Sequence, residues 1–175
     1  MQFLAGVGAA GRVSVAGYFG GGANSGGRFD TIDKVAFPDD TVTTLAAVLS
    51  SARSRLAGFA DSGVAGYFAG GFDGANLSAI DKITFPGQTK STLTATLTSA
   101  RQSVTGLDNS GVAGYSGGGF DGNYLDGIDK ITFPADTKTT LAAVLTTTVY
   151  NMGAFSNVGV AGYFAGGTDD NTYFT

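Results

Sequence analysis

Short stretches of alternating apolar and polar residues, separated by glycine-rich segments, run along the whole chain. The alternation is clearest in Thr92–Leu97, where leucine or alanine occupies every second position and threonine the positions between. Because side chains in a strand point to opposite faces in turn, this pattern predicts a half-buried strand. Three more strands are expected before it, at about Arg55–Ala60, Gly63–Gly70 and Ala79–Phe85.

Turn-forming residues separate these predicted strands. Asp61–Ser62–Gly63 predicts a tight turn between the first two strands, and the Gly-Gly pair after Tyr67 ends the second and opens a loop. Pro86 is expected to end the third strand, since proline cannot donate to the hydrogen-bond ladder. The unit is therefore predicted to be a four-stranded antiparallel meander.

This unit is repeated along the chain. Its tyrosine recurs as Tyr18, Tyr67, Tyr115 and Tyr163, at spacings of 49, 48 and 48 residues. The motif Ile-Asp-Lys recurs with Asp33, Asp81 and Asp129, at a spacing of 48. Self-similarity at such a period indicates a repeat architecture. We divide the chain into repeats at 1–50, 51–98 and 99–146, followed by a partial repeat at 147–175.

Composition agrees with an all-β fold and excludes several kinds of catalytic and metal site. The 175 residues are 43% hydrophobic and 14% charged, which fits a packed protein, and 29 glycines disfavour helix. All acidic residues are Asp, while Glu, His, Cys and Trp are absent. Without His or Cys, no Ser-His-Asp or Cys-His nucleophile, haem ligand or usual zinc or copper site can form. We therefore expect no enzyme activity, no cofactor and no metal site.

Charge and hydropathy bear on partners and location. A net charge of -4 without a basic cluster disfavours nucleic acid and anionic membranes. No apolar run is long enough to span a bilayer. The segment Met1–Gly8 lacks the positive residues of a secretion signal, and Leu4–Ala5–Gly6 is better interpreted as a strand equivalent to Leu56–Ala57–Gly58.

The best candidates for a binding surface are positions in the loops between second and third strands, where the repeats differ. Variation among otherwise similar units is where a recognition surface is expected. Calcium binding by the aspartates is the alternative, but Asp-Gly pairs are common turn formers and the spacing does not fit a calcium loop. The candidates are Asn24, Arg28, Asp73, Asn76, Asp121, Asn123, Tyr124, Asp126, Asp169 and Asp170.

Three repeated side-chain types have a functional and a structural interpretation. The aspartate of Ile-Asp-Lys stands beside a lysine, but neighbours in a strand point to opposite faces, so a structural role is predicted. The four tyrosines could stack on sugars, yet they lie in an apolar strand and are expected in the core. Arg53, Arg55 and Arg101 could form an anion-binding ring, but Val149 breaks the series, and packing or pairing with nearby aspartates is preferred.

The repeat resembles the Kelch repeat. The resemblance rests on Arg53–Phe59, then four hydrophobic residues before a double glycine in Gly63–Gly71, then the aromatic end of Ile80–Phe85. Kelch units generally carry a Trp near the end of the third strand, where this chain has Phe37, Phe85 and Phe133. The resemblance implies an all-β, Kelch-like β-propeller with four-stranded blades of about 48 residues, here three full blades and a half blade.

The Thr/Gly/Ala-rich texture of the repeats is also similar to Kelch-like repeats of marine bacteriophage virion and tail-fibre proteins. That resemblance implies a non-catalytic structural or binding module of a virion or other extracellular surface, with self-association, virion components, or a cell-surface glycan or protein receptor as partners. Alternatives are an intracellular Kelch adaptor or a lectin-like propeller. Closed propellers have about four to eight blades, so the half blade predicts either a fragment of a longer protein, which we favour, or closure by another chain.

Overall fold

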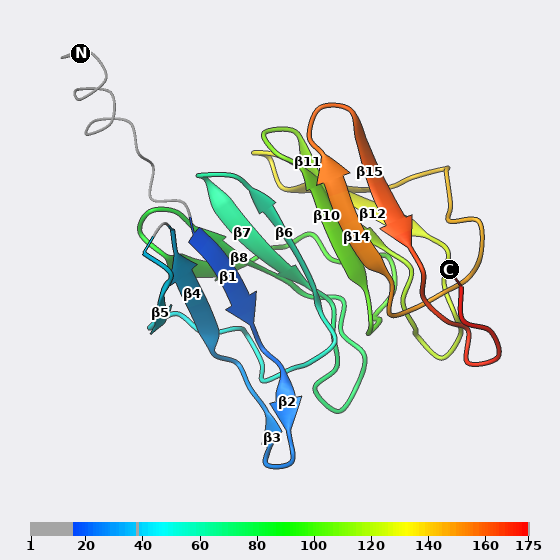
Figure 1. Ribbon diagram of the computed structural model, residues 1–175, viewed down its shortest axis with the longest axis horizontal. Helices are drawn as coiled ribbons and strands as arrows, with labels where there is room; N and C mark the ends of the chain where they lie inside the picture. Colours follow the sequence, from blue (N-terminus) through cyan, green and yellow to red (C-terminus); the bar gives the residue numbers. More distant parts are fainter. Residues whose placement is uncertain (1–15, 38, 175) are drawn as a thin grey trace.

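The computed structural model describes residues 16–37 and 39–174, and in these residues the fold is all-β, with no helix and only antiparallel strand pairs (Figure 1). The predicted fold class is confirmed at this level. Nowhere in the described ranges is there a helix that could cross a membrane. The expectations for Met1–Gly8 and Leu4–Ala5–Gly6 lie outside the described residues.

The two central repeats form sheets of the same design. In each sheet the strands pair in chain order, as a meander, and equivalent pairs are 48 residues apart, such as Tyr67 with Lys82 and Tyr115 with Lys130. The first sheet contains β6 (Ala57–Asp61), β7 (Ala65–Ala69), β8 (Ile80–Thr84) and β9 (Thr89–Thr92). The second contains β10 (Thr105–Asn109), β11 (Ala113–Gly117), β12 (Ile128–Thr132) and β13 (Thr137–Thr140).

The outer repeats form smaller sheets within the described residues. Towards the N-terminus lie β1 (Ala16–Gly20), β4 (Ile32–Ala36) and β5 (Thr41–Thr44), paired in that order. A short hairpin of β2 (Ala23–Asn24) and β3 (Gly27–Arg28) extends from the loop between β1 and β4. Towards the C-terminus, β14 (Gly153–Asn157) pairs with β15 (Ala161–Ala165).

The predicted fourth strand at Thr92–Leu97 is wrong in position. The strand is β9 at Thr89–Thr92, and residues 93–97 lie outside any ladder. Only every fourth amide bonds to the neighbouring segment, from Leu93 to the Ile80 carbonyl and from Leu97 to the Ser78 carbonyl, both at 2.9 Å. The alternation of burial in this segment is real. It arises because Leu93 and Leu97 pack against core residues of two sheets. β9 has no alternating apolar residues because it is an exposed edge strand.

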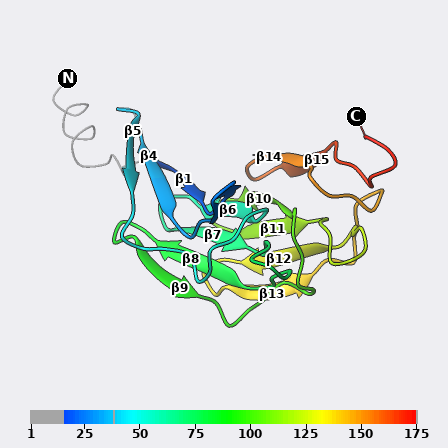
Figure 2. The same ribbon diagram turned by 90° about the horizontal axis from the view of Figure 1, so that it is seen from below.

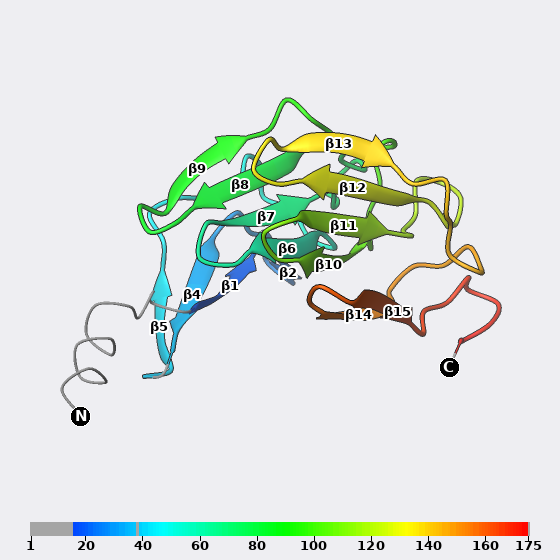
Figure 3. The same cartoon turned by 90° about the horizontal axis from the view of Figure 1, so that it is seen from above.

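The sheets pack face to face, with their first strands side by side. Thus β6 lies beside β10, and β10 beside β14, while β9 and β13 lie at the opposite side (Figures 2 and 3). At the first two junctions an aromatic ring of one sheet stacks on the tyrosine of the sheet before it. Phe85 stacks on Tyr18 with centroids 4.6 Å apart, and Phe133 on Tyr67 at 5.1 Å. The core is thus a series of interfaces between sheets.

The double glycine of each repeat ties it to the next repeat. The Gly22 amide donates to the Arg53 carbonyl and the Gly71 amide to the Arg101 carbonyl, both at 2.9 Å. Gly70, just before, has φ of 67°, and a Cβ there would lie 2.8 Å from the same Arg101 oxygen. A side chain is therefore excluded by both the backbone conformation and the close approach. This explains why the motif recurs in the first three repeats.

Buried ion pairs support two junctions. Arg53 donates to Asp81 at 2.9 Å, and Arg101 to Asp129 at 2.9 Å, with all four side chains at most 3% exposed. The backbone amide of Ser50 and that of Thr98, each from the preceding repeat, donate to the same two carboxylates. For Asp81 and Asp129 the structural interpretation, with Arg53 and Arg101 as their partners, is confirmed. Arg55 donates to Gln102 and not to an aspartate.

Candidate binding site on the loop edge

The loops between second and third strands lie together along one edge of the molecule, where β2 and β3 also project (Figure 1). Two pairs of successive loops are in contact, the first with the second and the third with the fourth. The Arg28 guanidinium lies 4.6 Å from the centroid of the Phe72 ring, and Arg28 Nη1 is 3.4 Å from the Asp73 carbonyl oxygen. Further along, the Tyr124 hydroxyl donates to Asp170 at 2.6 Å. The loop edge is thus built from several repeats.

An aromatic cleft forms where the loops of the third and fourth repeats meet. Tyr124 and Tyr150 stack with ring centroids 5.6 Å apart and planes within 10°, and Phe120 lies 5.4 Å from the Tyr124 ring. Asp170 accepts hydrogen bonds from both tyrosine hydroxyls. The cleft has a volume of about 190 Å³, and its lining is completed by Arg55, Gln102 and Ser103.

The opposite wall of this cleft carries hydrogen-bonding groups. Arg55 Nη1 donates to Gln102 Oε1 at 2.7 Å, across successive repeats. Arg55 has φ of 59°, and the equivalent residues Ser103 and Asn151 have φ of 53° and 57°. The Ser103 amide donates to the Arg55 carbonyl at 2.7 Å, so this unusual backbone is fixed by the stacking of the repeats. The position of the Arg55 backbone is therefore set by the scaffold.

Hydrogen bonding determines the electrostatics of the cleft. The hydrogen bond to Asp170, followed by burial and the negative charge of that carboxylate, raises the pKa of Tyr124 to about 12. The same acceptor raises the pKa of Tyr150. Conversely, hydrogen bonds from Tyr124 and Tyr150 lower the pKa of Asp170. At neutral pH the cleft therefore presents a carboxylate between two protonated phenols, opposite a guanidinium.

The structure brings some of the sequence-predicted loop residues together and leaves others as turn residues. Tyr124 and Asp170 meet in the cleft, and Arg28 contacts Asp73. The Asn76 side-chain oxygen is buried, and Asp126 binds the Leu145 amide through its backbone carbonyl. The other candidates accept hydrogen bonds from amides of their own loops: Asn24, Asp73, Asp121 and Asp169. The Asn123 amide is the donor to Asp121.

Sequence analysis missed two aromatic residues of the cleft, Phe120 and Tyr150, and two polar ones, Gln102 and Ser103. Tyr150 stands where the earlier repeats have Ser54 and Gln102, so it breaks the repeat just as the predicted loop residues do. A search for differences between repeats outside these loops would therefore have found Tyr150. Arg55, considered for an anion-binding ring, lines the cleft instead, because Arg53 and Arg101 are buried in ion pairs.

The repeated tyrosines differ in burial although their local sequences are nearly the same. Tyr67 is 1% exposed and lies between Phe59 and Phe133, as the core prediction requires. Tyr163 is 46% exposed. Within the described residues no group of three or more acidic side chains is close enough to bind a metal ion.

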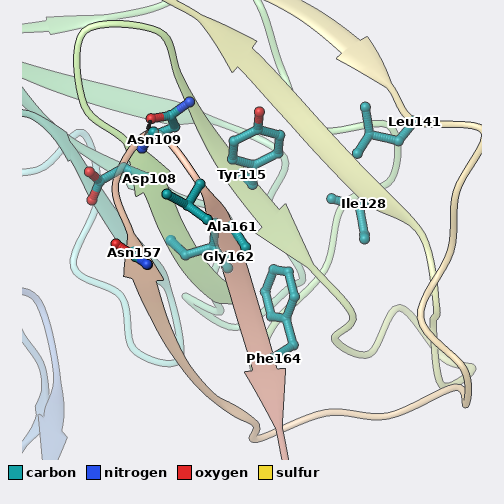
Figure 4. Close-up of a pocket in the computed structure, with 12 residues that line it drawn as sticks. Asp108, Asn109, Tyr115, Ile128, Leu141, Asn157, Ala161, Gly162 and Phe164 are labelled. Atoms are coloured by element: carbon teal, nitrogen blue, oxygen red, sulfur yellow. Dashed lines mark hydrogen bonds between the residues drawn. The ribbon is translucent and has the colours of Figure 1, made fainter.

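A second, more apolar cleft lies between the third and fourth repeats (Figure 4). Its volume is about 310 Å³, and its walls include Leu107, Tyr115, Ile128, Leu141 and Phe164. Tyr115 and Phe164 border it on one side and Ile128 and Leu141 on the other. It lies on a junction between sheets, away from the loop edge.

No family model matches this sequence, and no curated protein matches it at a significant level. The resemblance to Kelch repeats therefore rests on the residues of the chain itself.

Proposed function

We propose that this chain is a non-catalytic, Kelch-like β-propeller module that serves as a rigid scaffold and displays variable loops for recognition. In this proposal each sheet is a blade, and the module belongs to a virion appendage, such as a tail fibre, or to another extracellular surface structure. Support comes from the four-stranded meanders that recur at 48-residue intervals and pack with their first strands side by side. Radial packing of such units is the design of propellers.

One observation carries the recognition role: the strands repeat almost without change, while the loops on one edge do not. β8 and β12 are both Ile-Asp-Lys-Ile-Thr, and β7 and β15 are both Ala-Gly-Tyr-Phe-Ala. In contrast, Asn76, Tyr124 and Tyr173 form the equivalent β-bridge in their loops and differ in chemistry. A rigid scaffold with variable loops is the usual organisation of a binding protein.

A second candidate, saccharide binding, is favoured by the chemistry of the loop-edge cleft. Tyr124 and Tyr150 offer aromatic faces on which the apolar side of a sugar ring can stack. The same cleft contains a hydrogen-bond acceptor in Asp170, a donor in Arg55 and an amide, which is both, in Gln102. Sugar hydroxyls both donate and accept, so they require such a mixture. The cleft volume of about 190 Å³ suits a single monosaccharide unit better than a long chain.

A glycan array probed with the labelled 175-residue chain tests the saccharide candidate. We expect bound glycans to be lost by Tyr124→Ala and Tyr150→Ala. Tyr173→Ala is the matched control, because Tyr173 lies on the same edge, is 87% exposed and does not line the cleft. Binding that survives the first two variants, or that Tyr173→Ala abolishes, would exclude the cleft as the sugar site.

The appendage role has a separate test. Antibodies raised against the chain should label a discrete projection on particles from its source in negative-stain electron microscopy. Labelling confined to the interior of host cells would instead support the adaptor alternative. This outcome does not depend on which ligand the loop edge binds.

A further inference from the structure

Tyr124 and Tyr150 form a pair of phenols held against each other across two repeats. Tyr124 belongs to the loop of the third repeat, and Tyr150 to the connection that starts the fourth. Their rings are stacked, with centroids 5.6 Å apart and planes within 10°. Of the stacked ring pairs in residues 16–37 and 39–174, this is the one made of two tyrosines, since the others join a tyrosine to a phenylalanine. Two oxidisable rings are therefore neighbours at this position.

The two hydroxyl groups share one proton acceptor. Tyr124 Oη donates to Asp170 Oδ2 at 2.6 Å, and Tyr150 Oη donates to Asp170 Oδ1. The hydroxyls of these nearly parallel rings thus lie at the same end of the pair, and so do the Cε carbons next to them. The same hydrogen bonds lower the pKa of Asp170. Asp170 is therefore a carboxylate at neutral pH and can accept a proton from either phenol.

The composition of the chain makes tyrosine its principal one-electron donor. Trp and Cys, the other side chains that readily lose one electron, are absent from the sequence, while seven tyrosines are present. Methionine, of which there are two, reacts instead by taking up an oxygen atom. A radical on Tyr124 or Tyr150 therefore has the stacked phenol as its adjacent reaction partner. Both rings are partly exposed, so an oxidant in solution can reach them.

We propose that Tyr124 and Tyr150 are a site of oxidative cross-linking, at which a haem peroxidase with hydrogen peroxide joins the two rings as dityrosine. Each phenol gives one electron to the oxidised haem and its proton to Asp170, which passes the proton to water. The two radicals couple through a bond between their Cε carbons. The proton of each coupled Cε then moves to the phenolic oxygen, which restores the aromatic ring. In sum, two tyrosines and one hydrogen peroxide give dityrosine and two water molecules.

The cross-link joins the third repeat covalently to the fourth. It closes the chain between residues 124 and 150, which reduces the conformational freedom of the unfolded state at this junction. A protein without cysteine cannot form a disulfide, so dityrosine is a covalent staple that its composition still permits. This modification goes beyond the recognition role of the loop edge and does not depend on what that edge binds.

Mass spectrometry of the 175-residue chain, treated with a haem peroxidase and hydrogen peroxide, provides the test. Trypsin releases Tyr124 in the peptide 102–130 and Tyr150 in the peptide 139–175, because cleavage follows Arg101, Lys130 and Lys138. We expect the monomer to lose two hydrogen atoms and these two peptides to be joined. Fragmentation of the joined species should place the bond between Tyr124 and Tyr150.

Conservative variants locate the site and its proton acceptor. Tyr124→Phe and Tyr150→Phe retain a ring at each position and should each abolish the joined species. Tyr173→Phe is the matched control, because Tyr173 is 87% exposed and lies in the same tryptic peptide as Tyr150; it should leave the yield unchanged. Asp170→Asn keeps the size of the side chain but removes the base, and should slow cross-linking by about ten-fold or more. Circular dichroism checks that each variant is folded.

Several outcomes would overturn the proposal. A bond that involves Tyr115, Tyr163 or Tyr173 in place of the stacked pair would place the reaction elsewhere. Cross-links found only between chains, as dimers in denaturing gels, would exclude an intramolecular site, and so would oxidation confined to Met152. An unchanged rate in folded Asp170→Asn would show that this carboxylate is not the proton acceptor.

Discussion

Arg53 Nη2 lies 2.9 Å from Asp81 Oδ2, and both side chains are completely buried. Arg53 enters from the start of the second repeat, while the Ser50 amide and hydroxyl reach the same carboxylate oxygen from the end of the first. The ion pair therefore joins two repeats, and Arg101 with Asp129 does the same one repeat later.

Removal of one partner of this pair should be costly. We expect Asp81→Asn to lower the free energy of unfolding by about 3 to 5 kcal/mol, because it leaves a buried guanidinium without a counter-charge. Asp33→Asn is the matched control: it changes the equivalent aspartate of the first repeat, which is partly exposed and accepts from Thr44. Urea unfolding followed by circular dichroism measures both. Equal losses in the two variants would contradict this role of the pair.

Stability should fall at acid pH. Burial by itself would raise the pKa of Asp81, but hydrogen bonds from Ser50 and Thr92 and the charge of Arg53 together lower it, and Asp129 behaves alike. A carboxyl whose pKa is lower in the folded than in the unfolded chain stabilises the fold above about pH 4 and loses that contribution as pH falls further.

The matched variant for acid unfolding is the double change Arg53→Met with Asp81→Leu, which removes the pair and retains its volume. We expect its unfolding free energy to decline less steeply below about pH 4 than that of the unchanged protein. Urea titrations between pH 2 and 7 measure the two slopes. A steeper decline in the double variant would show that other carboxyls dominate acid unfolding.

Loss of the buried Tyr67 side chain should lower stability far more than loss of its exposed equivalent, Tyr163. Tyr67→Ala removes a ring held between Phe59 and Phe133 and should lower the unfolding free energy by about 3 to 5 kcal/mol. Tyr67→Phe removes only the hydrogen bond to Asp136, at a cost of about 1 kcal/mol. Tyr163→Ala, at a 46% exposed position, should change stability by no more than about 0.5 kcal/mol. Thermal unfolding compares the three; a large loss for Tyr163→Ala would be inconsistent with its exposure.

Two equivalent glycines should tolerate alanine differently. A Cβ at Gly106 would collide with the carbonyl of Gly58 in the neighbouring sheet, whereas a Cβ at Gly58 meets no atom within 4 Å. We expect Gly106→Ala to cost about 1 to 3 kcal/mol and Gly58→Ala to be close to neutral. Chemical denaturation of both variants checks the stacking of β6 against β10, and similar values for the two would argue against it.

The tyrosine titration of the loop-edge cleft should depend on Asp170. The pKa of Tyr124 is raised to about 12 chiefly by its hydrogen bond to Asp170. Asp170→Asn should therefore bring a tyrosine transition to lower pH in absorbance titrations at alkaline pH. Tyr124→Phe in the same background should remove that transition. A titration curve unaltered by Asp170→Asn would mean that the hydrogen bond is absent in solution.

Much of the fold follows directly from local sequence. The turn at Asp61–Ser62–Gly63, the end of the second strand at the double glycine and the end of the third strand before Pro86 all lie where predicted. These features depend on the backbone preferences of single residues, so they can be inferred without knowledge of neighbours. The predicted strand at Thr92–Leu97 was wrong, because alternation reports burial and not the presence of a ladder partner.

The cleft could be predicted only in part. Tyr124 and Asp170 stand out because they break the repeat, but 46 residues separate them, and their hydrogen bond exists because adjacent repeats stack in register. Tyr150 and Arg55 enter the same cleft from connections between repeats. Such proximity depends on how sheets pack, which no local pattern encodes.

By itself, the sequence determined the repeat, its period, the turns and the all-β class, since these depend on residue type and spacing. Only the tertiary structure decided what each copy of a repeated residue does. Tyr67 is core while Tyr163 is exposed, and Val149 stands where Arg53 and Arg101 bind buried aspartates. The physical reason is that burial and charge pairing belong to the interface between two sheets, and each repeat supplies only one side of it.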